Sequence, residues 1–274
     1  MRYIKLSFKY LIKNILFLFL LSLVPAIFIG SLLSPFKFLE FINNYPKLTI
    51  TGFADIFYSI IDISWLKILF YVIALALLAI CVSFVIGEIE NHFRSGKKNY
   101  KGYKNYINNN IMVVILNLVI FCVINFILSF LYGTIVYLFH ILIAGLNTHA
   151  NVALIIISII LGAIYFCLIV MVGLIALLNI PNMSFNGYNL KQSVSNSINL
   201  VSKNYFGLIL ACILPFAIII PLVSIFNFSS VALHIINVIC LIISIMYYSS
   251  FTMTAYFDLL GLTRYDERKY YNIK

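Results

Sequence analysis

The sequence predicts an all-α integral membrane protein with six transmembrane helices, and three observations support this fold class. First, 64% of the 274 residues are hydrophobic and only 9% are charged, whereas soluble domains carry about 25% charged residues. Second, no Asp, Glu, Lys or Arg occurs from residue 105 to 190 or from 204 to 257. Third, the apolar segments have about the 20 residues that a helix needs to cross roughly 30 Å of hydrocarbon.

Six segments meet this length, and each is taken as one spanning helix. The expected spans are about 15–33, 65–87, 111–132, 152–179, 205–226 and 232–256. The first segment could also be a secretory signal, because basic residues precede it, but no A-x-A-like cleavage site follows it. We expect residues 1–274 to form one transmembrane domain whose last residues, 259–274, are a short basic cytoplasmic tail.

The placement of the basic residues predicts the orientation. If both termini are cytoplasmic, every Lys and Arg except Lys37, Lys47 and Lys67 falls on the cytoplasmic side, as the positive-inside rule requires. We therefore expect a multi-pass protein of a bacterial inner membrane with cytoplasmic N and C termini. The net charge of +10 then reflects orientation and attraction to anionic lipid, and we expect no nucleic-acid partner.

Internal similarity suggests a repeated unit. Asn14 and Asn204 each follow a lysine, precede an apolar run and stand eleven residues before a proline, Pro25 or Pro215. Asn110 precedes a similar run that lacks the proline. We expect three helical hairpins, about 2–88, 98–180 and 189–258, each preceded by an amphipathic helix on the inner leaflet. Chance similarity within a strongly apolar chain is the alternative, and the second copy is the less secure one.

The connections on the outer side are expected to differ. Apolar residues recur on one helical face of segment 53–61, which predicts an outer-leaflet helix or a lid. A break is expected near Gly133, because an unbroken helix from 111 to 145 would be about 50 Å long, too long for one crossing. The third connection, from Asn227 to Ser230, is expected to be tight.

Prolines and asparagines inside the spans are the candidate pathway residues. Pro25, Pro215 and Pro221 lie near the expected midplane, where a proline frees a backbone carbonyl and kinks the helix, and broken helices at this depth form many transporter sites. Asn117 and Asn125 could add a polar lining on the third span. A structural interpretation is also open, because neighbouring groups satisfy freed carbonyls and asparagines bond helices together. We favour the structural interpretation.

The ionisable residues give only weak signs of chemistry. Glu88, Glu90 and His92 could bind a metal or move protons if they converged, but a solvated helix end explains them more simply. The outer histidines, His140, His149 and His234, match no ligand spacing, and the five cysteines lie in five different spans. We expect no catalytic residue, no metal, no cofactor and no enzymatic activity.

The most basic cytoplasmic segment is a candidate docking surface for a membrane partner or an ATPase. It contains Arg94, Lys97, Lys98, Lys101 and Lys104. The sequence leaves three function classes. We expect a non-catalytic membrane subunit of a transport, export or self-protection system. The alternatives are a stand-alone structural or regulatory membrane protein and, third, a membrane-embedded lipid enzyme, which would need the ionisable residues to converge.

Three stretches resemble a known kind of domain: SFVIGEIENHFRSGKKNYKGYKNYINNNIMVV, KQSVSNSINLVSKNYFGLILACILPFAIIIPLV and MYYSSFTMTAYFDLLGLTR. They are similar to bacterial six-helix polytopic membrane-domain families of unknown function, also found as the membrane domain of some glycerophosphodiester phosphodiesterases. The resemblance is one of pattern, covers most of the chain and includes no catalytic motif. It implies a six-helix membrane domain and no reaction, and it transfers no functional residue.

Overall fold

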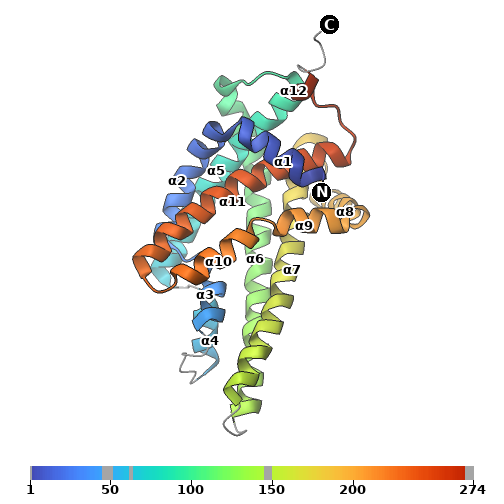
Figure 1. The fold of residues 1–274 in the computed structure, drawn as a ribbon. Coiled ribbons are helices and arrows are strands. Elements are labelled where there is room, and N and C mark those ends of the chain that lie inside the picture. Colours follow the sequence, from blue (N-terminus) through green and yellow to red (C-terminus); the bar gives the residue numbers. More distant parts are fainter. Residues whose placement is uncertain (1, 45–51, 62–63, 145–149, 269–274) are drawn as a thin grey trace.

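The computed structural model describes residues 2–44, 52–61, 64–144 and 150–268, which form an elongated helical bundle (Figure 1). Six helical stretches are long and apolar enough to cross a membrane, which confirms the predicted fold class in its coarse form. They are Ile15–Asn44, Phe53–Ser95, Tyr100–Ile143, Ala153–Asn186, Tyr205–Phe226 and Ser230–Leu259.

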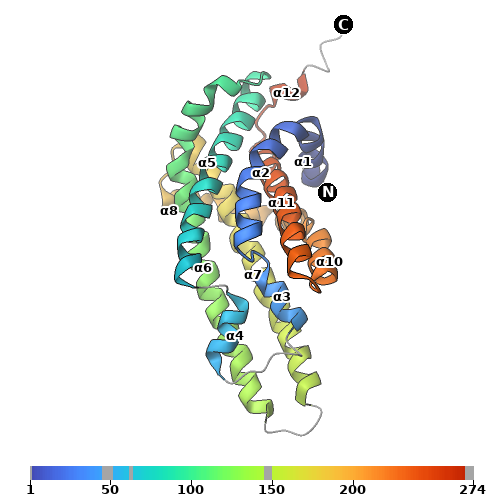
Figure 2. The same cartoon turned by 90° about the vertical axis from the view of Figure 1, so that its left-hand side faces the viewer.

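The first and last described helices, α1 and α12, lie toward one end of the bundle, here named the terminal end, and α6 and α7 reach furthest toward the opposite, hairpin end (Figures 1 and 2). The helices follow one another as α1 (Arg2–Lys13), α2 (Ile15–Leu32), α3 (Lys37–Asn44), α4 (Phe53–Ile60), α5 (Trp65–Ser95), the 3-10 turn η2 (Tyr100–Gly102), α6 (Tyr103–Ala144), α7 (Ala150–Asn186), α8 (Leu190–Lys203), α9 (Tyr205–Ile213), α10 (Phe216–Phe226), α11 (Ser230–Leu259) and α12 (Tyr265–Arg268).

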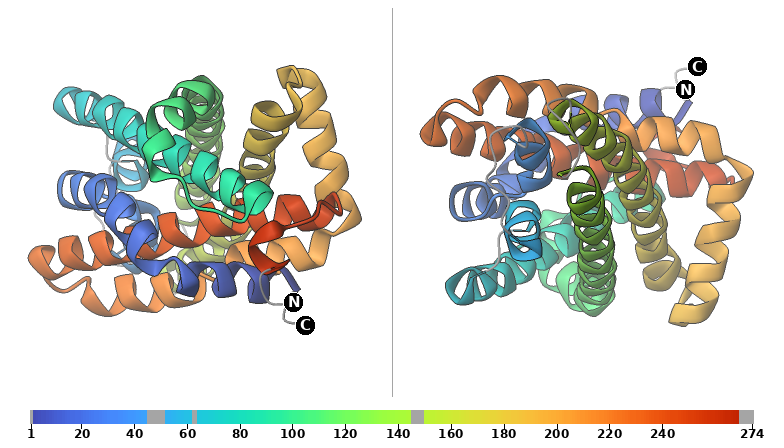
Figure 3. Two further views of the ribbon diagram at one scale, coloured as in Figure 1. Left: turned by 90° about the horizontal axis from the view of Figure 1, so that it is seen from above. Right: turned by 90° about the horizontal axis from the view of Figure 1, so that it is seen from below.

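The apolar core is divided along the length of the bundle. The largest cluster lies toward the terminal end and includes Phe93, Leu174 and Phe257. A second cluster joins α3 and α4 to the outer parts of α6 and α7, through residues such as Ile56 and Val136. α11 packs against α2 and α1, although these helices are far apart in sequence. α8 packs on α7 and lies at the periphery in both end-on views (Figure 3).

Two of the three predicted amphipathic helices are separate helices. α1 and α8 end one residue before Asn14 and Asn204, and these two asparagines share one backbone conformation, with φ/ψ of −122°/21° and −130°/30°. The Tyr3 hydroxyl of α1 also donates to Asn204 Oδ1 at 3.1 Å. At the third position, however, Asn110 lies inside α6. The expectation of a separate helix before the third span is therefore wrong, because η2 leads directly into one continuous helix.

The predicted break at Gly133 is also wrong. Gly133 lies within α6, which runs for 42 residues and is about 63 Å long. A Cβ at this position would lie 3.5 Å from Ile60 Cδ1 and 3.7 Å from the Phe53 ring of α4. The glycine thus provides a close surface for α4 instead of a bend.

For segment 53–61 the helix is confirmed, whereas its place in the outer leaflet stays a prediction. Segment 53–61 forms α4, whose Ile56 and Ile60 are buried against α6. The tight turn also forms, because α10 ends at Phe226 and α11 begins at Ser230. The short helix α3 was not predicted.

Candidate functional site

Pro25 leaves a backbone carbonyl without its donor in the helix, and a neighbouring helix supplies a hydrogen bond to this carbonyl instead. The carbonyl of Leu21, four residues before Pro25, accepts a hydrogen bond from Cys81 Sγ of α5 at 3.0 Å. Pro25 is buried, and α2 continues through it. The polar group that a proline exposes in a helix is therefore used here to hold α2 against α5.

Pro215 interrupts the helix, and the carbonyls that it leaves without a donor in their own helix are again hydrogen-bonded to a neighbouring helix. It separates α9 from α10. The freed carbonyl of Ala211 accepts from the Tyr247 hydroxyl, and that of Cys212 accepts from the Tyr248 hydroxyl, each at 2.7 Å. The hydroxyls of two consecutive tyrosines of α11 thus replace the hydrogen bonds that the helix loses at the break. Pro221 lies inside α10, which continues through it.

This arrangement predicts a coupling between Pro215 and Tyr247. Tyr247→Phe leaves the Ala211 carbonyl unbonded, and the loss of about 1 kcal/mol should lower the melting temperature in detergent by roughly 2–4 °C. In a Pro215→Ala background the new backbone N–H can donate to the same carbonyl, so Tyr247→Phe should have almost no effect. Thermal unfolding tests this by comparing Tyr247→Phe with the unaltered protein, and the double variant with Pro215→Ala alone. The exposed Tyr58→Phe is the control. Equal losses in the two backgrounds would contradict it.

Asn117 belongs to a buried set of polar residues that joins three helices, here named the asparagine cluster. Its members, all buried, are Asn117 of α6, Asn179 and Asn182 of α7, and Ser193 and Ser197 of α8. Asn179 Nδ2 donates to Asn117 Oδ1 at 2.6 Å, and Asn179 Oδ1 accepts from the Ser193 hydroxyl. Asn182 Nδ2 donates to Ser197 Oγ at 2.9 Å.

Asn125, the other candidate on α6, also faces α7. Its Oδ1 accepts from the Tyr165 hydroxyl at 3.2 Å, and that hydroxyl lies 2.6 Å from Ser129 Oγ. Both candidate asparagines therefore make contacts between helices. Sequence reasoning missed their partners, although the spacing of Asn179, Asn182 and Asn186 already places three amides on one face of α7.

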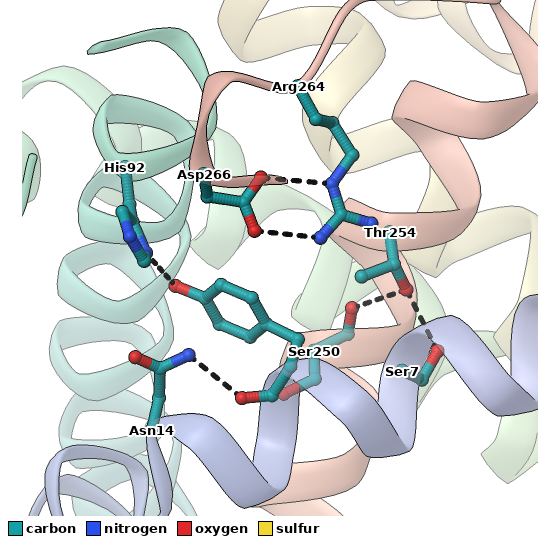
Figure 4. Close-up of polar contacts among 8 residues, drawn as sticks. Ser7, Asn14, His92, Ser250, Thr254, Arg264 and Asp266 are labelled. Carbon is teal, nitrogen blue, oxygen red and sulfur yellow. Dashed lines mark hydrogen bonds and ion pairs between the residues drawn. The ribbon is translucent and has the colours of Figure 1, made fainter. Parts of the chain in front are cut away.

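Polar residues at the terminal end join α1 to α5 and α11 (Figure 4). The Tyr10 hydroxyl of α1 lies 3.0 Å from His92 Nδ1 of α5, and Ser7 Oγ lies 2.8 Å from Thr254 Oγ1 of α11. Burial raises the pKa of the Tyr10 hydroxyl above its ordinary value of 10.0, and the nearby Asp266 and Glu88 raise it further. The Tyr10 hydroxyl therefore stays protonated in its hydrogen bond with the ring nitrogen of His92.

Part of the expected tail is packed against the same place. Arg264 and Asp266 form a two-bond ion pair at 3.2 and 3.0 Å, and both side chains are largely buried (Figure 4). The Arg264 guanidinium lies 4.0 Å from the centre of the Phe93 ring, and α12 packs on α5. Residues 264–268 therefore cover the end of the large apolar cluster.

The ionisable candidates do not converge. Glu88 Oε1 accepts from the backbone N–H of Asn99, Glu90 pairs with Arg94, and His92 pairs with Tyr10. Among the histidines predicted to lie outside, His234 Nδ1 lies 3.2 Å from the Gly30 carbonyl, whereas His149 lies outside the described residues. Among the residues that the structure describes, no three His, Cys, Asp or Glu side chains form a group that could hold a metal ion.

Four of the five basic candidates lie in residues 96–104, here named the lysine turn, which join α5 to α6 and include η2 and the first residues of α6. Gly96 ends α5 in the left-handed conformation, with φ 69°. The backbone N–H of Lys97 donates to Ser95 Oγ at 3.1 Å, and that of Asn99 donates to Glu88 Oε1 at 3.0 Å. Asn91 Nδ2 donates to the carbonyl of Lys97 at 3.1 Å. All four lysines of the turn are exposed: Lys97, Lys98, Lys101 and Lys104.

Arg94 differs from these lysines. Its Nε donates to Glu90 Oε1 at 2.8 Å, and its guanidinium lies about 6 Å from the rings of Phe185 and Phe257. The side chain is still more than half exposed. Arg94 therefore fixes the end of α5, and the free positive charge of this region is concentrated on the lysine turn.

Comparisons with protein-family models, with curated proteins and with solved structures gave no match. The resemblance to six-helix membrane-domain families stays a prediction. The class of protein follows from the fold: six apolar helices long enough to span a bilayer define a multi-pass membrane protein. Several of its buried polar groups are hydrogen-bonded between helices, whereas the side chains of Ser83, Asn237 and Ser250 have no hydrogen-bond partner among the described residues. Exposed lysines lie in the lysine turn, in α1 and in α8.

Proposed function

We propose that this chain is the non-catalytic membrane subunit of a transport, export or self-protection system, and that its lysine turn docks an acidic surface of a partner such as an ATPase. The observation that carries the proposal is that the backbone of the turn is fixed by several hydrogen bonds while its four lysine side chains point into solvent. A pre-organised turn loses little conformational entropy on binding, and clustered charge accelerates encounter with an opposite surface.

The finer topology belongs to the same proposal. We place α1 and α8 on the inner leaflet, because their buried faces carry serines (Ser7 in α1, Ser193 and Ser197 in α8) while Ile12 and Ile198 are exposed. An interfacial helix turns its apolar side chains toward lipid in this way. The shared geometry at Asn14 and Asn204 supports a repeat of the first and third units. The continuous α6 gives no such support for the second.

A stand-alone structural or regulatory membrane protein is the second candidate. The hydrogen bonds at Pro25, Pro215 and the asparagine cluster favour it, because the polar groups inside the bundle serve contacts between helices. The third class, a membrane-embedded lipid enzyme, required these ionisable residues to converge, whereas Glu88, Glu90 and His92 have separate partners.

Reversing the charge of the lysine turn tests the docking role. We expect the tagged protein, purified from native membranes in mild detergent, to bring down an ATPase or another partner at near-equal amount. Lys97→Glu, Lys98→Glu, Lys101→Glu and Lys104→Glu together should reduce the recovered partner at least tenfold, because like charges then face each other. Quantitative mass spectrometry measures the ratio.

The matched control reverses two exposed lysines on α8, Lys191→Glu and Lys203→Glu, and should leave the partner bound. Full retention of the partner by the lysine-turn variant would exclude that turn as the docking surface. Recovery of lipid alone with the unaltered protein would favour the stand-alone candidate instead.

A further inference from the structure

The helices α6 and α7 are longer than their neighbours and longer than a bilayer is thick. α6 has 42 residues and α7 has 37, about 63 and 55 Å, whereas α9 and α10 together form a span of 22 residues. The apolar part of α6, residues 111–144, is about 51 Å long, and at a tilt of 40°, the upper end of the usual range, it still extends roughly 39 Å along the membrane normal. Figures 1 and 2 show both helices continuing beyond the ends of α5, α10 and α11.

Aromatic side chains indicate where the bilayer boundary lies beside the shorter helices. Trp65 at the start of α5 is 91% exposed, and Phe228 in the turn between α10 and α11 is 79% exposed. Exposed aromatic residues at helix ends are typical of the membrane–water interface. α6 and α7 do not stop at this level.

The outer parts of α6 and α7 carry an exposed apolar surface, here named the hairpin patch. Its members are Leu131, Ile135, Leu138, Ile141, Leu142, Ile156, Ile159 and Ile160. The patch continues the exposed apolar stripe of the inner parts of the same helices, which includes Val123 and Ile164. No charged residue occurs anywhere from 105 to 190, so no polar boundary separates the patch from the membrane-spanning part.

The composition of the hairpin patch indicates what covers it. Protein interfaces have a polar rim and are enriched in Tyr, Trp, Phe, Met and Arg, whereas the hairpin patch, with the neighbouring exposed Phe139, is apolar and lies in a stretch without any charged residue. Another side of the hairpin is covered by α3 and α4, which carry Lys37, Glu40 and Asp55. The hairpin therefore has one flank covered by helices that carry charged residues and one exposed apolar flank.

We propose that the hairpin patch binds lipid acyl chains, so that the hydrocarbon layer extends further outward beside α6 and α7 than beside α9 and α10. The chain then imposes an uneven hydrophobic thickness on the bilayer around it. A bilayer that is thicker on one side of the protein than on the other is locally distorted. The inferred activity of the chain is this distortion of the surrounding bilayer. This inference rests on the membrane-spanning fold and is independent of the lysine turn.

Depth-dependent fluorescence quenching tests the proposal, because the chain has a single tryptophan. Trp65→Phe removes the native signal, and Leu142→Trp or Ile164→Trp places one probe at the patch or in the middle of α7. Both positions are exposed, at 69% and 54%, so the fold should tolerate the changes. In vesicles whose lipids carry bromine on the acyl chains, we expect both probes to lose about half of their fluorescence or more.

Each other outcome overturns a stated part of the inference. If the probe at Ile164 is quenched and the one at Leu142 is not, the hairpin patch lies outside the hydrocarbon. Quenching at Leu142 by aqueous acrylamide would then show water contact, and protection from both quenchers would show a protein cover such as a second copy. If neither probe responds to brominated lipid, the membrane-spanning fold itself is wrong.

Discussion

Replacement of Gly30 by alanine is expected to destabilise the protein strongly. The new Cβ would lie 2.7 Å from the backbone nitrogen of Val238 and 2.8 Å from its Cα, so α2 and α11 would have to separate where they cross. Small residues at such crossings allow the backbone contact that stabilises membrane helices. Overpacking of about 2–3 kcal/mol should lower the melting temperature in detergent by roughly 5–10 °C, measured by thermal unfolding.

Gly52 provides the matched control. It precedes α4, and a Cβ built there meets no atom within 4 Å, so Gly52→Ala should change the melting temperature by little. Gly30→Ala should also disturb the His234 Nδ1 contact with the Gly30 carbonyl, which is 3.2 Å in the structure. A melting temperature that is the same for both alanine variants would disprove the close crossing of α2 and α11.

The second large effect is expected in the asparagine cluster. Asn179→Leu preserves the approximate volume of the side chain but leaves Asn117 Oδ1 without its donor. The Ser193 hydroxyl loses Asn179 Oδ1 and keeps only the backbone carbonyl of residue 179, at 3.2 Å, as acceptor. Buried polar groups without partners each cost about 1–3 kcal/mol. We expect the melting temperature to fall by roughly 4–8 °C. The exposed Asn109→Leu, on the same helix as Asn117, should have almost no effect.

The double variant distinguishes hydrogen bonding from a simple loss of packing. When both partners are replaced by apolar groups, much of the penalty disappears, because fewer polar groups remain unbonded. Asn117→Leu combined with Asn179→Leu should therefore be less destabilising than the sum of the two single changes. Strict additivity in thermal unfolding would show that the two side chains do not act as a pair.

Composition and hydropathy were sufficient to predict the six apolar helices, because charged residues are costly in hydrocarbon and are therefore rare in membrane-spanning segments. Local rules were less reliable at Gly133. Glycine is a weak helix former, and a bend there would have made α6 fit one crossing. The structure instead uses the missing side chain for contact with α4, a tertiary effect that no local pattern contains.

The candidate residues show a similar division. Hydropathy placed Pro25, Pro215 and Asn117 within apolar spans, and all three side chains are buried. It could not identify their partners, because Cys81 lies 60 residues from Leu21 and Tyr247 lies 36 residues from Ala211. Helix periodicity gives the face on which a residue lies, and only the packing of the helices decides which residue meets it.

The contact between α1 and α11 has a consequence for biosynthesis. Ser7 and Thr254 are separated by 247 positions, and the neighbouring α2 packs largely on the same last span. Chains emerge from the ribosome N-terminus first, so the first helices enter the membrane long before the surface that will cover them exists. For most of translation the nascent chain therefore has an open groove along α2, which closes only when the final helix arrives.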